Sequence, residues 1–211
     1  MRKSIVAGAL FALTILMLAG CTSKNTAPVA KAAEPVAEKT EVPQIVTAKT
    51  AFWPMYKAAH EWAPDVVVIR LTAKSVPGYT NEAGKAGMWE AVFGSPSRHQ
   101  YRLFTYSIID HLPEIHKGVA AERAMPWAGE TRDAMAIDTT QFNVDSDTAY
   151  QTAATNAADW LKKNPKKELA SLEMGQTYHF QGPVWYVLWG DKKAGYNALI
   201  DGSNGKSLIK K

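Results

Sequence analysis

The sequence contains a single cysteine, Cys21, among its 211 residues. A lone thiol excludes an intramolecular disulfide and a zinc site built from several cysteines. The five histidines form neither an H-x-x-x-H nor an H-E-x-x-H pattern, which would place two zinc ligands on one helix face. We interpret His111 and His116, the closest pair, as solvated loop residues. No serine stands in a G-x-S-x-G turn, so the sequence predicts no catalytic residue, no metal site and no cofactor.

The sequence also lacks a large excess of charge of either sign. The formal net charge is +4, with 24 basic and 20 acidic residues. Removal of the first 20 residues would take away Arg2 and Lys3 and leave 22 basic residues against 20 acidic ones. Because affinity for nucleic acid comes largely from clustered positive charge, we expect no nucleic-acid partner.

The N-terminus has the composition of a targeting segment. Two basic residues follow Met1, and the stretch from Ser4 to Gly20 carries no charge. Its length is at the lower limit for a membrane-spanning helix, but the short positive start and the small residues at its end favour a secretory signal peptide.

Leu18-Ala19-Gly20-Cys21 resembles the lipobox of bacterial lipoproteins. This resemblance implies that the thiol of Cys21 is acylated, that residues 1–20 are cleaved as a signal peptide, and that the lipid anchors the protein in the cell envelope. In that family an aspartate after the cysteine favours the inner membrane. Thr22 stands there, which implies the outer membrane, facing the periplasm, in a host with two membranes.

Residues 21–50 are expected to be the lipidated cysteine followed by a flexible, disordered tether. The stretch from 22 to 50 has no aromatic residue and has prolines at positions 28, 35 and 43. Such a composition buries too little apolar surface to offset the entropy lost on ordering. A short edge strand at 44–47 is the alternative.

The remaining chain contains an internal repeat. Trp89–Gly94 and Trp185–Gly190 share the pattern W-x-x-aliphatic-aromatic-G at an offset of 96 residues. Before each motif, apolar residues at helical spacing predict helices over 52–63 and 147–163. Alternation within each motif predicts strands whose buried positions are Trp89, Ala91 and Phe93 in one, and Trp185, Val187 and Trp189 in the other. Trp89 and Trp185 should therefore face the same helix-covered side.

These patterns predict an α+β fold of two helix-plus-antiparallel-meander units in tandem. The first unit spans 51–110, a connecting segment spans 111–144, and the second unit spans 145–211. The connecting segment has little periodicity, and its length indicates either a functional loop or a cover for the body.

The second unit resembles a PepSY-type domain. The resemblance rests on Val144–Tyr150, which opens the helix, on the P-x-W-x-V strand at Pro183–Val187, and on the D-x-x-x-G turn at Asp201–Gly205. The first unit keeps the tryptophan strand but lacks the final turn. The family implies secreted or envelope proteins that bind or restrain other proteins, peptidases among them, and that have no catalytic residues of their own.

The sequence thus favours a lipid-anchored, non-catalytic module that binds a protein or peptide. An envelope hydrolase and a structural scaffold of an envelope assembly are the alternatives. We expect the partner surface on the sheet face opposite the tryptophans, where alternation places Tyr186 and Leu188. If instead the two units stack face to face, these two residues would be core.

Overall fold

The computed structural model describes residues 42–208. The predicted signal peptide, Cys21 and most of the predicted tether therefore lie outside the described residues. Two helices and eight strands follow one another in the order α1 (Ala48–Trp62), β1 (Val67–Lys74), β2 (Met88–Ser95), β3 (Gln100–Ser107), β4 (Gly118–Ala121), β5 (Met125–Pro126), α2 (Ser146–Lys163), β6 (Leu169–Gly175), β7 (Val184–Trp189) and β8 (Tyr196–Asp201). A short 3-10 helix, Thr139–Gln141, precedes α2.

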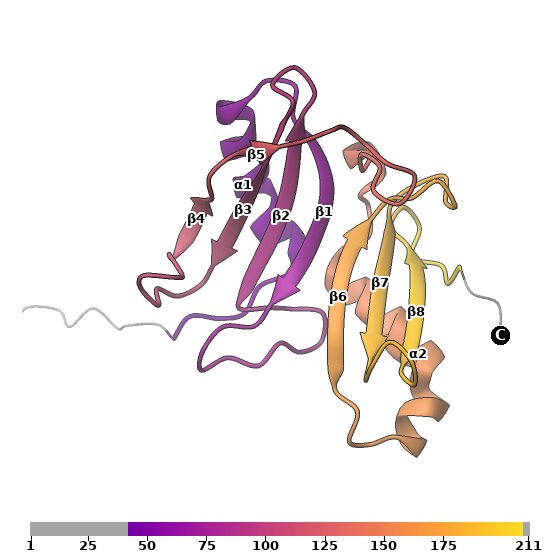
Figure 1. The fold of residues 1–211 in the computed structure, drawn as a ribbon. Coiled ribbons are helices and arrows are strands. Elements are labelled where there is room, and N and C mark those ends of the chain that lie inside the picture. Colours follow the sequence, from indigo (N-terminus) through magenta and orange to yellow (C-terminus); the bar gives the residue numbers. More distant parts are fainter. Residues whose placement is uncertain (1–41, 209–211) are drawn as a thin grey trace, which may run out of the picture. The chain divides into compact units, whose positions relative to one another are not determined.

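One antiparallel sheet contains all the strands, in the order β4-β3-β2-β1-β6-β7-β8, with β5 paired to β3. The α+β fold with two helix-plus-meander units is confirmed. The two meanders meet through β1 and β6, so both units share one sheet, and both helices lie behind it in Figure 1. We call the other side, free of helices, the outer face.

Helix α1 begins about one turn before the predicted start. Its N-cap residue, Thr47, makes no capping bond with its side chain. The first amide groups are instead satisfied by the start of α2: Ala48 N donates to Ser146 Oγ at 2.8 Å, and Lys49 N donates to Asp145 Oδ1 at 3.0 Å. Because these two capping residues lie far along the chain, local sequence patterns around α1 do not reveal them.

Helix α2 matches its prediction closely. Asp145 is its N-cap and accepts a hydrogen bond from Ser146 N, and Asn164 is its C-cap. Three alanines, Ala149, Ala153 and Ala157, are buried along one side of the helix. Their small side chains let the helix backbone lie close to the sheet.

The strand registers confirm the predicted inner face. Trp89 and Trp185 are both fully buried on the helix-covered side, together with Ala91, Phe93 and Val187. Trp89 pairs with Ala73 of β1, and Trp185 pairs with Met174 of β6, so the two tryptophans occupy corresponding positions of the repeat.

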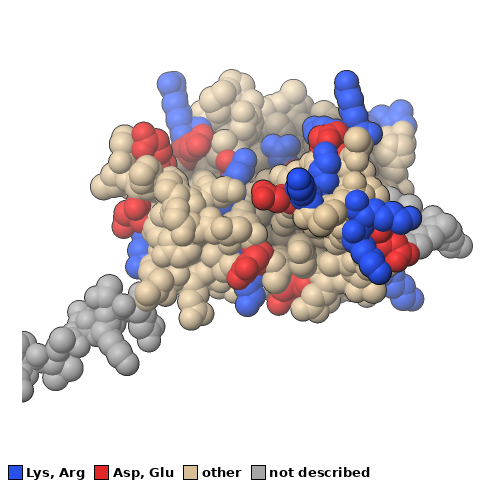
Figure 2. Space-filling view, turned by 90° about the horizontal axis from the view of Figure 1, so that it is seen from below, with Lys and Arg blue, Asp and Glu red and all other residues tan. Residues whose placement is uncertain are grey.

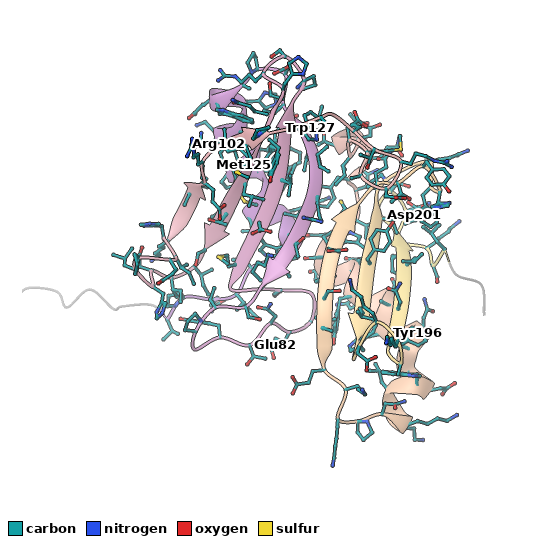
Figure 3. All side chains as sticks on the ribbon, viewed as in Figure 1. Glu82, Arg102, Met125, Trp127, Tyr196 and Asp201 are labelled. Carbon is teal, nitrogen blue, oxygen red and sulfur yellow. The ribbon has the colours of Figure 1, made fainter. Side chains whose placement is uncertain are left out.

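The connecting segment adds to the sheet and then crosses it. β4 and β5 both pair with β3, and neither was predicted. The ring of Trp127 then lies against Gly94 on the outer face: a Cβ atom built on Gly94 would be 2.6 Å from the ring. Figure 3 shows Trp127 on this face of β2. The segment therefore covers part of the outer face of the first unit, one of the two roles that its length indicated.

Candidate binding surface

The outer face of the sheet has apolar side chains at both ends and polar ones in the middle. The strand registers place half-buried apolar residues there in each unit: Val92, Tyr101 and Leu103 in the first, and Tyr186, Leu188 and Leu199 in the second. The same alternation that buries the tryptophans forces these residues outward.

Charged side chains occupy the central strands. Arg70 and Lys74 of β1 and Glu173 of β6 face outward, and Lys74 forms a 3.1 Å ion pair with Glu90 of β2. A charged stripe thus separates the two apolar patches, which is the arrangement expected of a solvated sheet centre rather than of one continuous apolar interface.

Tyr186 of β7 lines a cavity of about 250 Å³ together with Arg70 of β1, Glu173 of β6 and Asp133. Burial raises the pKa of the Tyr186 phenol, and the nearby negative charge of Glu173 raises it further. Asp133 comes from the connecting segment, which therefore forms one wall of this cavity. Leu188 lies two residues further along β7 and is half-buried as well.

The two units do not stack on each other. They lie side by side in one sheet, so the outer face of the second unit is not hidden by the first. Tyr186 and Leu188 are neither core nor fully exposed, and their role as a partner surface stays a prediction.

The outer faces of the two units are covered differently. In the first unit, Trp127 lies on Gly94. The corresponding glycine of the second unit is Gly190, and the nearest atoms to its Cβ position belong to the aliphatic chain of Lys167 and to Gly195. An aromatic ring thus covers this position in the first unit, and an aliphatic lysine chain lies there in the second.

A cluster of lysines occupies one end of the second unit. Lys167, between α2 and β6, forms a 3.1 Å ion pair with Asp191 in the β7–β8 turn and so joins the two turns. The other exposed lysines at this end are Lys162 and Lys163, in the last turn of α2, and Lys166, Lys192 and Lys193, in the two connecting turns. Figure 2 looks at this end and shows blue side chains gathered over the second unit. In the sequence these lysines form two separate runs, and only the fold brings the runs together.

The Asp201–Gly205 turn has the form that the sequence predicts. Asp201 accepts hydrogen bonds from Ser203 N at 2.8 Å, from the Ser203 hydroxyl at 2.6 Å and from the Asn204 side-chain amide at 2.8 Å. Partial burial acts to raise the pKa of the Asp201 carboxyl, but these bonds outweigh it and lower that pKa. Gly205 has a φ of 74°, a conformation that side chains rarely adopt.

His111 and His116 are both exposed in the β3–β4 connection. Within residues 42–208, no three histidine, cysteine or acidic side chains are grouped so as to hold a metal ion. Neither helix in that range is long and apolar enough to cross a membrane.

No protein-family model and no curated protein matches the sequence. Among solved structures, one similar chain is a "putative lipoprotein" from Clostridium difficile 630. It has 9% sequence identity and a TM-score of 0.48, and the match covers 73% of this chain and 87% of the other. A similarity at this level does not bear on what this chain does.

Proposed function

We propose that the protein is a lipid-anchored protein of the cell envelope whose body binds another protein or a peptide and catalyses no reaction. The anchor is the lipid on Cys21, which the lipobox Leu18–Cys21 supports. In a host with two membranes, Thr22 favours the outer membrane, with the body in the periplasm. The resemblance of the second unit to PepSY-type domains supports an envelope protein, for example a peptidase, as the partner.

The observation that carries the binding role is the outer face of the second unit. Three large apolar side chains remain partly accessible there: Tyr186 and Leu188 on β7, which pairs with a strand on each side, and Leu199 on the edge strand β8. Accessible aromatic and aliphatic groups on a rigid backbone lose little entropy when they are buried by a partner.

The anchor is tested by replacing Cys21 with alanine. Acylation gives the chain enough buried methylene groups for stable membrane attachment, at about 0.8 kcal/mol per group. We expect the wild-type protein to sediment with membranes after a high-salt wash, and Cys21→Ala to appear in the soluble fraction. Retention of the variant in the membrane pellet would place the anchor elsewhere.

The partner surface is tested with two double variants of the full chain. Tyr186→Ala/Leu188→Ala removes two outer-face side chains of the second unit, and Val92→Ala/Leu103→Ala removes two from the first. In pull-downs from detergent-solubilised membranes, we expect a partner retained by the wild type to be lost only from the first variant. Both variants should keep the wild-type far-UV circular dichroism. Retention of the partner by a folded Tyr186→Ala/Leu188→Ala variant would exclude this surface.

The hydrolase alternative makes a different prediction. If the protein were an enzyme, the purified chain would turn over a peptide or glycan substrate, and replacing one particular histidine or carboxylate would abolish turnover. The scaffold alternative predicts neither turnover nor a partner that depends on Tyr186 and Leu188.

A further inference from the structure

The charge of the body is distributed unevenly. Of the 24 basic and 20 acidic residues in the sequence, 17 of each kind fall within residues 42–208, so this range has no formal net charge. Six of its basic residues gather at the end of the second unit described above, which we call the lysine end: Lys162, Lys163, Lys166, Lys167, Lys192 and Lys193. The segments that carry them, 159–168 and 191–193, contain only three acidic residues. The rest of the range has 11 basic residues against 14 acidic ones, so it is negative where the lysine end is positive.

Most of the positive charge at the lysine end has no role within the body. Among the residues that the structure describes, one of the six lysines forms an ion pair, Lys167 with Asp191. Two more lie in the last turn of α2, where positive charge stabilises the helix end. The other three are exposed on turns: Lys166, Lys192 and Lys193. Because like charges that gather without compensation repel one another, this collection points to an anionic partner outside the chain.

The described chain starts at the same edge of the sheet. Because neighbouring strands are antiparallel, β1, β3 and β7 end at the edge where β2, β6 and β8 begin. The connections from α2 to β6 and from β7 to β8 lie at this edge and carry the lysine end. Residues 42–44 line a cavity with Ser107 and Gly118, at the end of β3 and the start of β4. Both places lie toward the bottom of Figure 1.

This shared edge brings the lysine end close to a membrane. Cys21 is the proposed site of the lipid, and the 20 residues from 22 to 41 separate it from Val42. A chain of that length spans at most about 70 Å, so the lipid keeps this edge of the sheet within that distance of the bilayer. Anionic headgroups attract clustered lysines, and the attraction falls off within about 8 Å at physiological salt. The lipid thus holds the lysines where a short-ranged attraction can act.

We propose that the lysine end docks on the anionic phospholipid headgroups of the membrane leaflet that holds the lipid of Cys21. The proposal rests on the lipid anchor proposed above. The lipid keeps the body near the membrane, and the lysines orient it, because the rest of the body carries an excess of acidic residues that such a leaflet repels. With this edge on the bilayer, the strands lead away from the membrane. The outer face, with Tyr186 and Leu188, then stays open to a partner.

The test uses the mature, lipidated chain, purified in detergent and added to preformed vesicles. Neutral vesicles contain phosphatidylcholine alone, and anionic vesicles contain about one third phosphatidylglycerol. Sedimentation reports attachment to the vesicles. Lysines are then modified with a soluble acetylating reagent, and mass spectrometry gives the reactivity of each one. Anionic headgroups that cover an amine also favour its protonated form, and both effects lower its reactivity.

We expect Lys166 and Lys193 to react at least about threefold more slowly on anionic than on neutral vesicles, which corresponds to a body that is docked about two thirds of the time. Lys206 is the internal control. It is exposed, and its carbonyl accepts a hydrogen bond from Asp201 N at the end of β8, at the opposite edge of the sheet. Its reactivity should be the same on both kinds of vesicle. Salt at about 1 M shortens the range of the attraction to about 3 Å and should remove the protection.

Two matched variants separate the lysine end from the net charge of the chain. Lys166→Glu/Lys193→Glu reverses two exposed charges at the lysine end, and Lys57→Glu/Lys206→Glu reverses two exposed charges elsewhere. We expect the first variant to lose the protection of the remaining lysines at the lysine end, and the second to keep it. Both variants should keep the wild-type far-UV circular dichroism, because all four side chains are exposed.

Failure of the anchor and failure of the docking give different results. Loss of attachment to neutral vesicles would overturn the lipid anchor and, with it, this proposal. Attachment with equal lysine reactivity on both kinds of vesicle would overturn the docking alone. Protection that is already complete on neutral vesicles would show that another protein surface covers the lysines. Protection that appears only when a soluble polyphosphate is added would make the partner a free polyanion, and either result would overturn docking on the bilayer.

Discussion

Trp89 and Trp185 pack edge to face at the centre of the body, with their ring centroids 6.3 Å apart. Each indole N–H donates to the carbonyl of a valine just before a helix: Trp89 to Val46 at 2.9 Å, and Trp185 to Val144 at 3.0 Å. The same residue type thus performs the same two tasks in both units. Each tryptophan fills the core and fixes the entry of its own helix, and the contact between them joins the units.

Truncation of either tryptophan should therefore be severe. We expect Trp89→Ala and Trp185→Ala each to lower the free energy of unfolding by about 3–5 kcal/mol, because a large cavity forms and the valine carbonyl loses the indole donor. Urea denaturation followed by circular dichroism measures the loss. Trp53 is 48% exposed on α1 and provides the control, since Trp53→Ala should cost less than about 1.5 kcal/mol. Equal losses at all three sites would contradict this account of the core.

Much of this architecture could be predicted from local patterns. Period-2 alternation around Trp89 and Trp185 reports which face is buried, because burial acts on every second residue of a strand. Helix α2 was equally readable, since its cap Asp145 is adjacent in sequence. Three features were not predicted from the sequence: the early start of α1, the strands β4 and β5, and the pairing of β1 with β6. All three depend on contacts between residues that are distant in the sequence.

The repeat also hides a change of chemistry. In the first unit, the Ser95 hydroxyl donates to Asp65 at 2.7 Å and joins the turn after β2 to the start of β1. In the second unit, the corresponding turn residue is Asp191, and it accepts from Lys167 at 3.1 Å. The contact is kept while donor and acceptor are exchanged, so a comparison of residue types alone does not find the match.

For the candidate surface, alternation placed Tyr186 and Leu188 on the outer face, but the cavity wall contributed by Asp133 could not be predicted from the sequence.

The shared helix cap gives a second prediction. Asp145 accepts from its own helix at Ser146 N and from the other helix at Lys49 N, so one carboxylate lies near the positive ends of two helix dipoles. A single lost N-cap costs about 0.5–2 kcal/mol. We expect Asp145→Ala to destabilise the protein by about 2 kcal/mol or more in urea denaturation.

Asp159, exposed on α2, is the control for this experiment. Asp159→Ala removes the same charge from a position that caps neither helix, and it should change stability by less than about 0.5 kcal/mol. A similar effect of the two substitutions would show that Asp145 does not stabilise both helices.

Asp65 gives a prediction about pH. Hydrogen bonds from the Ser95 side chain and from the Ser97 backbone lower the pKa of its carboxyl from 3.8 to about 2. The pKa of Asp65 is lower in the folded state than in the unfolded state. The ionised carboxylate therefore stabilises the fold fully above about pH 4, and this stabilisation is lost as the pH falls from about 4 to about 2. In Asp65→Asn, the free energy of unfolding should therefore depend less steeply on pH between 4 and 2. Unchanged steepness, measured by urea denaturation at pH 4, 3 and 2, would contradict the assigned hydrogen bonds.

The contact between Gly94 and Trp127 yields the last prediction. A Cβ on Gly94 would lie 2.6 Å from the indole ring, so Gly94→Ala must displace the ring or the strand and should cost about 1–3 kcal/mol. Gly175 lies in β6, and its Cβ would meet Tyr186 at an ordinary 3.9 Å. Gly175→Ala should therefore be neutral or stabilise the protein by up to about 1 kcal/mol, because alanine restricts the unfolded chain.

In a Trp127→Ala background the cost of Gly94→Ala should largely disappear, since the obstructing ring is gone. A double-mutant cycle in urea denaturation measures this coupling, and additive losses would show that Trp127 does not lie on the first unit as described.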